Sequence, residues 1–147
     1  MYGIEIALEE AAAAGSRGEV PVGAAVLAAD GTLLARAGNQ VEATHDASAH
    51  AELLAMRSAA RVLGSPRLVG CTVAVTLEPC AMCAAAMVHF RVQRVVFGAY
   101  DAKGGGVDHG PRVFDAPGCL HRPEVVGGVR EAEAAALLRG FFQDRRP

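Results

Sequence analysis

Side chains that bind metal ions or carry protons gather in two short segments of the chain. His50 and Glu52 are separated by one residue, and Cys80 and Cys83 form a Cys-x-x-Cys motif directly after Pro79. Zinc prefers cysteine and histidine ligands, and sulfur–zinc bonds of about 2.3 Å let two cysteines three residues apart on a helix reach one ion. The spacing therefore predicts about one zinc ion per chain, bound by His50, Cys80 and Cys83.

The predicted zinc site has the composition of a catalytic centre. Three protein ligands leave the fourth tetrahedral position for water, whereas a structural site normally fills it. Residues two apart on a helix do not face the same way, so Glu52 should not bind the ion beside His50 but should reach its water from the side. We therefore expect Glu52 to act as a general acid and base.

Helices and strands must alternate to bring these two segments together. Apolar periodicity, the Asp30-Gly31 turn signal and the positions of glycine and proline define the elements. Asp46 or Ser48 can cap the helix that carries Glu52. The expected elements are helix 2–16, strands 20–29 and 32–37, helix 49–62, strand 71–77, helix 80–89, strand 92–98 and helix 131–142. Residues 101–122 form a long loop, and such loops are usually functional.

The strand, helix, strand order of residues 71–98 predicts a parallel crossover, beside the antiparallel hairpin of residues 20–37. We expect one α/β domain over residues 1–147, built as three layers, α/β/α, around a mixed sheet of about five strands. Its metal would be held at the start of two helices. The apolar share of 52% and the 20% of charged residues are typical of a globular domain.

Composition also limits location and partners. The formal charge of −2 gives no global electrostatic case for nucleic acid binding, so any RNA contact must be local. No apolar run approaches the roughly 18 residues of a membrane span, and no signal segment is evident, so we expect a cytoplasmic protein. Cys71 fits a core residue and Cys119 has no partner by spacing; neither is assigned a role.

Joined in this order, the His-x-Glu and Pro-Cys-x-x-Cys motifs form the signature of zinc deaminases, although each motif alone is weak. At these residues the chain resembles the cytidine deaminase-like superfamily, and most closely the bacterial tRNA-specific adenosine deaminases. The resemblance runs nearly end to end. Its matching segments are residues 19–24, 39, 45–52, 76–83, 96–99 and 101–103.

The resemblance implies a hydrolytic reaction that releases ammonia and converts adenosine to inosine at the tRNA wobble position. It assigns the zinc ligands and the proton shuttle Glu52 to the residues named above, and it implies a homodimer. Asn39 would hydrogen-bond the substrate, and Val22 and Ala51 would line the base pocket. The substrate-binding residues that it implies are Val22, Asn39, Ala51, Pro79 and Asp101.

The chain departs from those enzymes at positions expected to grip RNA. Tyr100 replaces an expected arginine, Phe90 a serine and Leu120 an asparagine, and residues 109–112 read His-Gly-Pro-Arg. The roles of Tyr100 and of the 104–121 loop stay unassigned. Arginines near the C-terminus offer phosphate contacts, although charged helix ends are usually only solvated. These are Arg139, Arg145 and Arg146.

Two alternatives follow from these departures. A deaminase of free nucleobases or nucleosides, such as guanine, cytosine or cytidine, is favoured by the acidic charge and the altered loop. A non-catalytic, zinc-stabilised RNA-binding subunit is a hypothesis of another class. Glu52 argues against the second alternative, because a scaffold needs no proton carrier beside an open zinc position.

Overall fold

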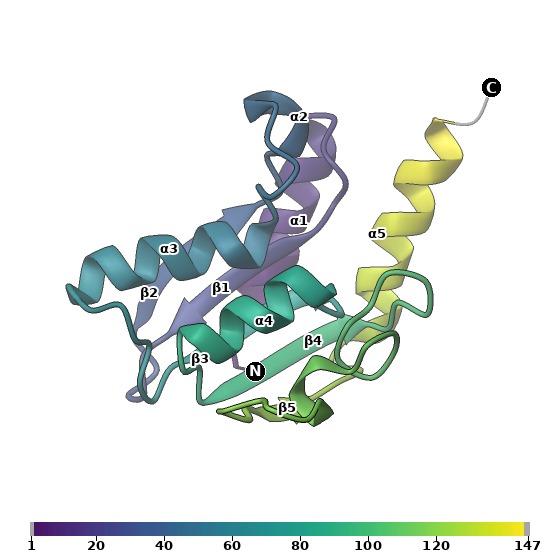
Figure 1. The fold of residues 1–147 in the computed structure, drawn as a ribbon. Coiled ribbons are helices and arrows are strands. Elements are labelled where there is room, and N and C mark those ends of the chain that lie inside the picture. The colour runs from purple at the N-terminus through teal and green to yellow at the C-terminus, as the bar shows by residue number, and fades with distance from the viewer. Residues whose placement is uncertain (1, 146–147) are drawn as a thin grey trace.

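The computed structural model describes residues 2–145, which form one five-stranded sheet with helices on both faces (Figure 1). The elements follow the predicted order, with additional short segments. They are α1 (Ile4–Ser16), β1 (Gly23–Leu27), β2 (Leu33–Gly38), α2 (Val41–Thr44), α3 (Ala51–Leu63), β3 (Thr72–Leu77), α4 (Ala81–His89), β4 (Arg94–Ala99), the 3-10 helix η1 (Val113–Asp115), β5 (Glu124–Val126) and α5 (Glu131–Asp144).

The sheet is mixed, as predicted. Its strand order is β2-β1-β3-β4-β5, in which β1 runs antiparallel to both neighbours and β3, β4 and β5 run parallel. The crossover from β3 through α4 to β4 confirms the parallel unit expected over residues 71–98. The sheet thus joins an antiparallel hairpin to a parallel half, with β3 between them.

Helices α1 and α5 cover one face of the sheet, and α3 and α4 cover the other (Figure 1). Alternation along β3 shows how both faces are buried: Val73 and Val75 belong to the core beneath α3 and α4, while Ala74 packs with Ile4 and Ala7 of α1. Small aliphatic residues suit a sheet that is buried on both faces. The predicted three-layer α/β/α arrangement is therefore confirmed.

Close packing of α1 on β1 depends on Gly23. A Cβ atom at this position would lie 2.1 Å from the Ala7 carbonyl oxygen and 2.4 Å from the Ala11 backbone nitrogen. No side chain fits in that space, so the helix backbone rests almost directly on the strand. This contact holds α1 against the start of β1, an inner strand of the sheet.

The two helices that carry the predicted ligands start slightly later than expected. His50 is the N-cap of α3 and Cys80 is the N-cap of α4, both with extended backbone. The prediction that Asp46 or Ser48 caps α3 is wrong, because Asp46 Oδ1 instead accepts the Ser48 N–H and hydroxyl in a turn before the helix. Cys83 is the third helical residue, so both cysteines remain at the helix start.

Within residues 2–145, no helix is both long and apolar enough to cross a membrane.

Candidate active site

The three predicted ligands come together at the N-termini of α3 and α4. His50 Nδ1 lies 3.6 Å from Cys80 Sγ and 3.5 Å from Cys83 Sγ, and the three ligand atoms all lie within 4.8 Å of one another. Tetrahedral zinc with ordinary bond lengths places nitrogen and sulfur ligands about 3.5 Å apart. The spacing and the donor types therefore fit a zinc ion, and Nδ1 is the histidine atom that would bind it.

Electrostatics distinguish the two thiols. The hydrogen bond from Cys83 lowers the pKa of Cys80 to about 4, so Cys80 is a thiolate at neutral pH. That same hydrogen bond to Cys80, together with burial, raises the pKa of the Cys83 thiol. The pair shares one proton, which a metal ion must displace because thiolates are the ligand form.

Glu52 lies in the first turn of α3 and is buried, with 4% of its surface exposed. Burial raises its pKa to about 7, because desolvation disfavours the charged carboxylate. A carboxyl group with this pKa can hold or release a proton near neutral pH, which suits a general acid and base. Glu52 also lines the cavity beside His50 and Cys80.

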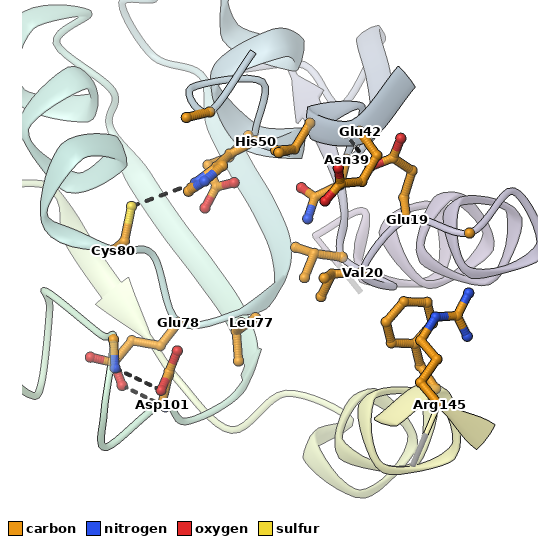
Figure 2. A pocket seen from close by; sticks show the side chains of 17 residues that line it. Glu19, Val20, Asn39, Glu42, His50, Leu77, Glu78, Cys80, Asp101 and Arg145 are labelled. Atoms are coloured by element: carbon orange, nitrogen blue, oxygen red, sulfur yellow. Dashed lines mark hydrogen bonds between the residues drawn. The ribbon is translucent and has the colours of Figure 1, made fainter. Parts of the chain in front are cut away.

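A cavity of about 700 Å³ opens at this group (Figure 2). Its walls come from the turn between α1 and β1, residues 39–47, the end of β3, the loop after β4, and the C-terminal part of α5. Segments far apart in sequence therefore enclose the space next to the metal-binding group. Helix α5 contributes Phe141 and Arg145, and the Arg145 guanidinium lies 3.6 Å from the centre of the Phe141 ring.

The structure places the five predicted substrate-binding residues in two groups. Val22, Asn39 and Asp101 line the cavity. Ala51 and Pro79 are buried beneath it and are not among the lining residues. Instead, their backbones make contacts, because the Ala51 N–H donates to Asn39 and the Pro79 carbonyl accepts from Gly106.

Asp101 also organises its own loop. Its Oδ1 accepts the backbone N–H groups of Lys103 at 3.1 Å and of Gly104 at 2.9 Å. The carboxylate thus closes a tight turn at the cavity wall.

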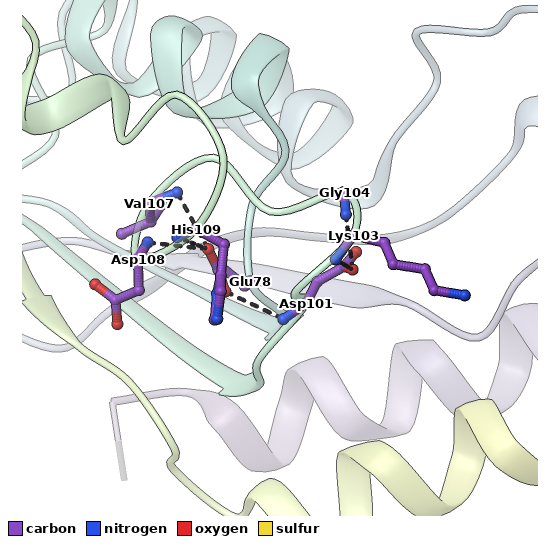
Figure 3. A network of polar contacts seen from close by, with 7 residues as sticks. All are labelled: Glu78, Asp101, Lys103, Gly104, Val107, Asp108 and His109. Carbon is purple, nitrogen blue, oxygen red and sulfur yellow. Dashed lines mark hydrogen bonds and ion pairs between the residues drawn. The ribbon is translucent and has the colours of Figure 1, made fainter.

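Glu78 is the residue that sequence reasoning missed (Figure 3). Its side chain is fully buried, and its carboxylate accepts hydrogen bonds from the loop that follows β4. Burial by itself would raise the pKa of Glu78, but the N–H donors outweigh it and lower the pKa. In the sequence Glu78 directly precedes the Pro-Cys-x-x-Cys motif, and no role was assigned to it. Its hydrogen-bond partners lie more than 20 residues away along the chain.

Glu19 is a second buried acid without a sequence-based assignment. It accepts the backbone N–H groups of Glu42 at 3.0 Å and Ala43 at 2.8 Å, at the start of α2. Carboxylates stabilise helix N-termini in this way. Glu19 therefore holds α2 against the cavity, and its place in the matching segment 19–24 was the available signal.

The positions where the chain departs from the expected pattern lie outside the cavity. None of Tyr100, Phe90 and Leu120 is among the cavity-lining residues. The Tyr100 ring contacts Phe97 at 5.0 Å and His109 at 6.2 Å between ring centres. These three side chains therefore do not form the cavity wall, and their expected contact with RNA stays a prediction.

The remaining cysteines lie apart from the metal-binding group. Cys71 is buried in the core, as expected, and burial raises the pKa of its thiol. Cys119 donates to the His121 carbonyl at 3.2 Å. Neither belongs to the group formed by His50, Cys80 and Cys83.

A family sequence pattern described as the cytidine and deoxycytidylate deaminase zinc-binding region matches residues 1–99. Together with the mixed sheet and the His, Cys, Cys group at two helix N-termini, this match shows that the chain belongs to that deaminase family. The family resemblance seen in the sequence is therefore confirmed.

Several relatives of this chain are named tRNA-specific adenosine deaminases. The protein of that name from Agrobacterium fabrum is 49% identical over 143 residues, covering 97% of this chain and 93% of its own length. That of Bacillus subtilis is 46% identical, covering 95% and 86%. A solved structure from a study of A-to-I editing by tRNA:A34 deaminases superposes with a TM-score of 0.89 at 48% identity, covering 91% of this chain and 96% of that chain.

Guanine deaminases share the fold at lower identity. The enzyme from Bacillus subtilis superposes with a TM-score of 0.66 at 25% identity, covering 98% of this chain and 95% of that chain.

Proposed function

We propose that this protein is a zinc-dependent hydrolytic deaminase that converts adenosine to inosine at the wobble position of tRNA. One observation carries the chemistry: a buried acid with a pKa near 7, Glu52, lies beside a group with zinc-ligand spacing at a cavity of about 700 Å³. The identity of 49% over nearly the whole chain to a tRNA-specific adenosine deaminase supports the substrate.

In this proposal His50, Cys80 and Cys83 hold the ion, which supplies Lewis acidity and lowers the pKa of water. Glu52 takes one proton from the water that attacks C6 of adenine. It delivers this proton to the ring nitrogen next to that carbon. Glu52 then takes the remaining proton from the newly bound oxygen and passes it to the exocyclic amino group, so the C–N bond breaks, ammonia leaves and the oxygen becomes the carbonyl of inosine. Water is the co-substrate, and every proton is accounted for by the one carboxyl group.

Asn39 is proposed to orient the substrate. Its Oδ1 accepts the Ala51 N–H at 2.8 Å, so its NH₂ group is left to donate to the base or ribose at the cavity wall. Val22 and Asp101 would complete the contacts along the walls. Ala51 and Pro79 would act from beneath, through the backbones that hold Asn39 and the loop after β4 in place.

One feature of the cavity favours RNA over a free base. The Phe141 ring and the Arg145 guanidinium form a wall that suits stacking and phosphate contact with nucleotides flanking an unstacked adenosine.

Incubation with a panel of substrates tests the proposal. An anticodon stem-loop with adenosine at the wobble position is compared with guanine, cytosine, cytidine and adenosine, and ammonia and inosine are measured. We expect inosine in the stem-loop and little release from the free compounds. Release from guanine or cytidine without inosine in the stem-loop would establish the free-base alternative. Zinc and RNA binding without any turnover would establish the scaffold alternative.

We further propose that the protein works as a homodimer in the cytoplasm. Met82 and Leu120 are large apolar residues that are 40% and 83% exposed. Leu120 and Val88 of α4 line a surface hollow of about 300 Å³, which supports association of this face with another copy. Light scattering after size exclusion tests the oligomer, and a monomer at micromolar concentration would contradict it.

A further inference from the structure

The carboxylate of Glu78 gathers both ends of the loop that follows β4 (Figure 3). Oε1 accepts the Asp101 N–H at 3.1 Å, and Oε2 accepts the N–H groups of Val107, Asp108 and His109 at 3.2, 2.9 and 3.1 Å. These four donors come from positions up to eight residues apart. One buried side chain therefore sets the path of the whole loop.

A fifth contact closes this arrangement from a side chain. His109 Nδ1 lies 2.8 Å from Glu78 Oε1. Both oxygens of the Glu78 carboxylate already accept backbone N–H groups, so this carboxylate acts as a hydrogen-bond acceptor toward the loop. Nδ1 therefore carries the proton and donates. Charge-assisted hydrogen bonds of this length are the strong ones, so His109 holds the far end of the loop firmly.

The loop backbone is fitted to this carboxylate. A Cβ atom at Gly105 would lie 2.4 Å from Glu78 Oε2 and 2.5 Å from the Asp101 carbonyl oxygen. The neighbouring Gly106 donates its N–H to the Pro79 carbonyl at 2.8 Å. The loop is thus joined to the chain segment that leads directly into Cys80.

The position of the loop determines one wall of the cavity. Asp101 and Gly104 line the cavity, whereas His109 does not. Glu78 lies two residues before Cys80 and also lines the cavity, so the loop is held relative to the metal-binding group itself. The far end of this loop is held by His109, which belongs to the His-Gly-Pro-Arg segment where the sequence departs from the expected pattern.

We propose that His109 is a positioning residue for substrate binding, which acts by pinning the 101–109 loop to Glu78 so that Asp101 and Gly104 form the wall against the RNA. This proposal rests on the proposed function. It assigns substrate affinity to His109, and it leaves proton transfer to Glu52 and metal binding to His50, Cys80 and Cys83.

Three replacements of His109 separate its hydrogen bond from its ring. His109→Asn places an amide donor near Nδ1, His109→Phe keeps the ring beside Tyr100 without a donor, and His109→Ala removes both. Asp108→Ala is the matched control, because its side chain points away from Glu78 while its N–H is retained (Figure 3). The side chain of His109 is 35% exposed, so its removal leaves no closed core cavity.

The measurements are KM and kcat on the wobble-adenosine stem-loop, zinc content, and amide exchange of residues 101–109. We expect His109→Ala and His109→Phe to raise KM about tenfold with kcat within about twofold of wild type and zinc retained. KM should stay near the wild-type value in His109→Asn and in Asp108→Ala. Amides 107–109 should exchange faster only in the variants without a donor.

Two outcomes would overturn the proposal: an unchanged KM in His109→Ala, or an equal rise in KM for His109→Asn and His109→Phe. A fall in melting temperature with unchanged KM would show a purely structural role. If wild-type protein produces no inosine, the proposed function fails and the RNA role of His109 fails with it. The amide-exchange comparison then still decides whether His109 pins the loop.

Discussion

The side-chain oxygen of Asn39 accepts a 2.8 Å hydrogen bond from the backbone N–H of Ala51, the residue between His50 and Glu52. This bond fixes the amide orientation of Asn39 and, at the same time, the first turn of α3. A residue that faces the substrate cavity is therefore coupled directly to the two side chains proposed for metal binding and proton transfer.

Replacing Asn39 separates its two contacts. Asn39→Asp keeps an acceptor for the Ala51 N–H but removes the NH₂ donor, so we expect normal zinc content and at least a tenfold rise in KM. Asn39→Ala also leaves the buried Ala51 N–H without its partner, which should lower the free energy of unfolding by about 1–3 kcal/mol. Urea unfolding and steady-state kinetics measure both effects. Unchanged KM in Asn39→Asp would contradict the donor role.

Metal content depends on the three-residue group. Purified protein should contain about one zinc ion per chain, and His50→Ala or Cys83→Ala should lose most of it because each removes a ligand. Elemental analysis measures the content. Cys119→Ala is the control, since it removes a thiol outside the group. Full zinc occupancy in Cys83→Ala would place the metal elsewhere.

Glu52→Gln should abolish turnover while keeping the fold and the zinc. Loss of a positioned general acid and base typically costs 10²- to 10⁴-fold in rate, and we expect a fall in kcat of at least about 100-fold. Ammonia release and elemental analysis measure the two properties. Glu42→Gln provides a comparison in the same cavity, because Glu42 is exposed and lies outside the buried first turn of α3. Substantial kcat in Glu52→Gln would assign the proton transfers to another group.

Glu78→Gln should destabilise the protein in a pH-dependent way. Because the folded-state pKa of Glu78 lies below its usual 4.5, its carboxylate contributes stability that is present above about pH 4.5 and is lost as the pH falls through the folded pKa. We expect Glu78→Gln to lower the free energy of unfolding by roughly 2–3 kcal/mol at pH 7. The difference from wild type should shrink below about pH 4.5.

Urea unfolding between pH 3 and 7 tests this dependence. Glu131→Gln, at an exposed position, is the control and should show almost no difference at any pH. A difference between Glu78→Gln and wild type that stays constant with pH would exclude the ionised carboxylate as its source.

Arg145→Ala should weaken RNA binding without changing turnover of a free nucleoside. Each lost phosphate contact reduces the counterions released on binding, so the salt dependence of the affinity should also become shallower. Fluorescence anisotropy at several salt concentrations measures the RNA affinity and its salt dependence. Arg67→Ala removes the same charge from the turn between α3 and β3, away from the cavity lining, and should have little effect. Equal effects of the two variants would indicate nonspecific electrostatics. Arg146, named with Arg145 in the sequence analysis, lies outside the described residues.

Local patterns predicted most of the fold. The helix expected over 49–62 and the strand over 71–77 differ from α3 and β3 by one or two residues, because apolar periodicity and flanking glycines set their limits. Elements of three or four residues, such as α2 and β5, are too short to show a period. Strand β5 was therefore missed individually even though five strands were expected.

The metal-binding group was also predictable, because its spacing encodes its geometry. The role of Glu78 was not, since its five hydrogen bonds join residues 23 to 31 positions away and nothing local marks them. Arg145 was named for phosphate contact, but its place beside Phe141 on the cavity wall was not predictable, because it depends on how α5 docks against the sheet. Long-range contacts thus limited the site prediction more than residue chemistry did.

The three proposed zinc ligands lie at the starts of two different helices, so binding of the metal depends on the folding of both segments. His50 follows the antiparallel hairpin, whereas Cys80 and Cys83 follow β3, and the pairing of β3 with β1 from Ala24–Val75 to Leu27–Thr72 joins the two segments in the fold. Neither half of the chain presents more than two of the three donors. Metal affinity is therefore a reporter of completed tertiary structure, and during synthesis a chain acquires a full-strength site only once Cys83 has emerged and the central strands have paired.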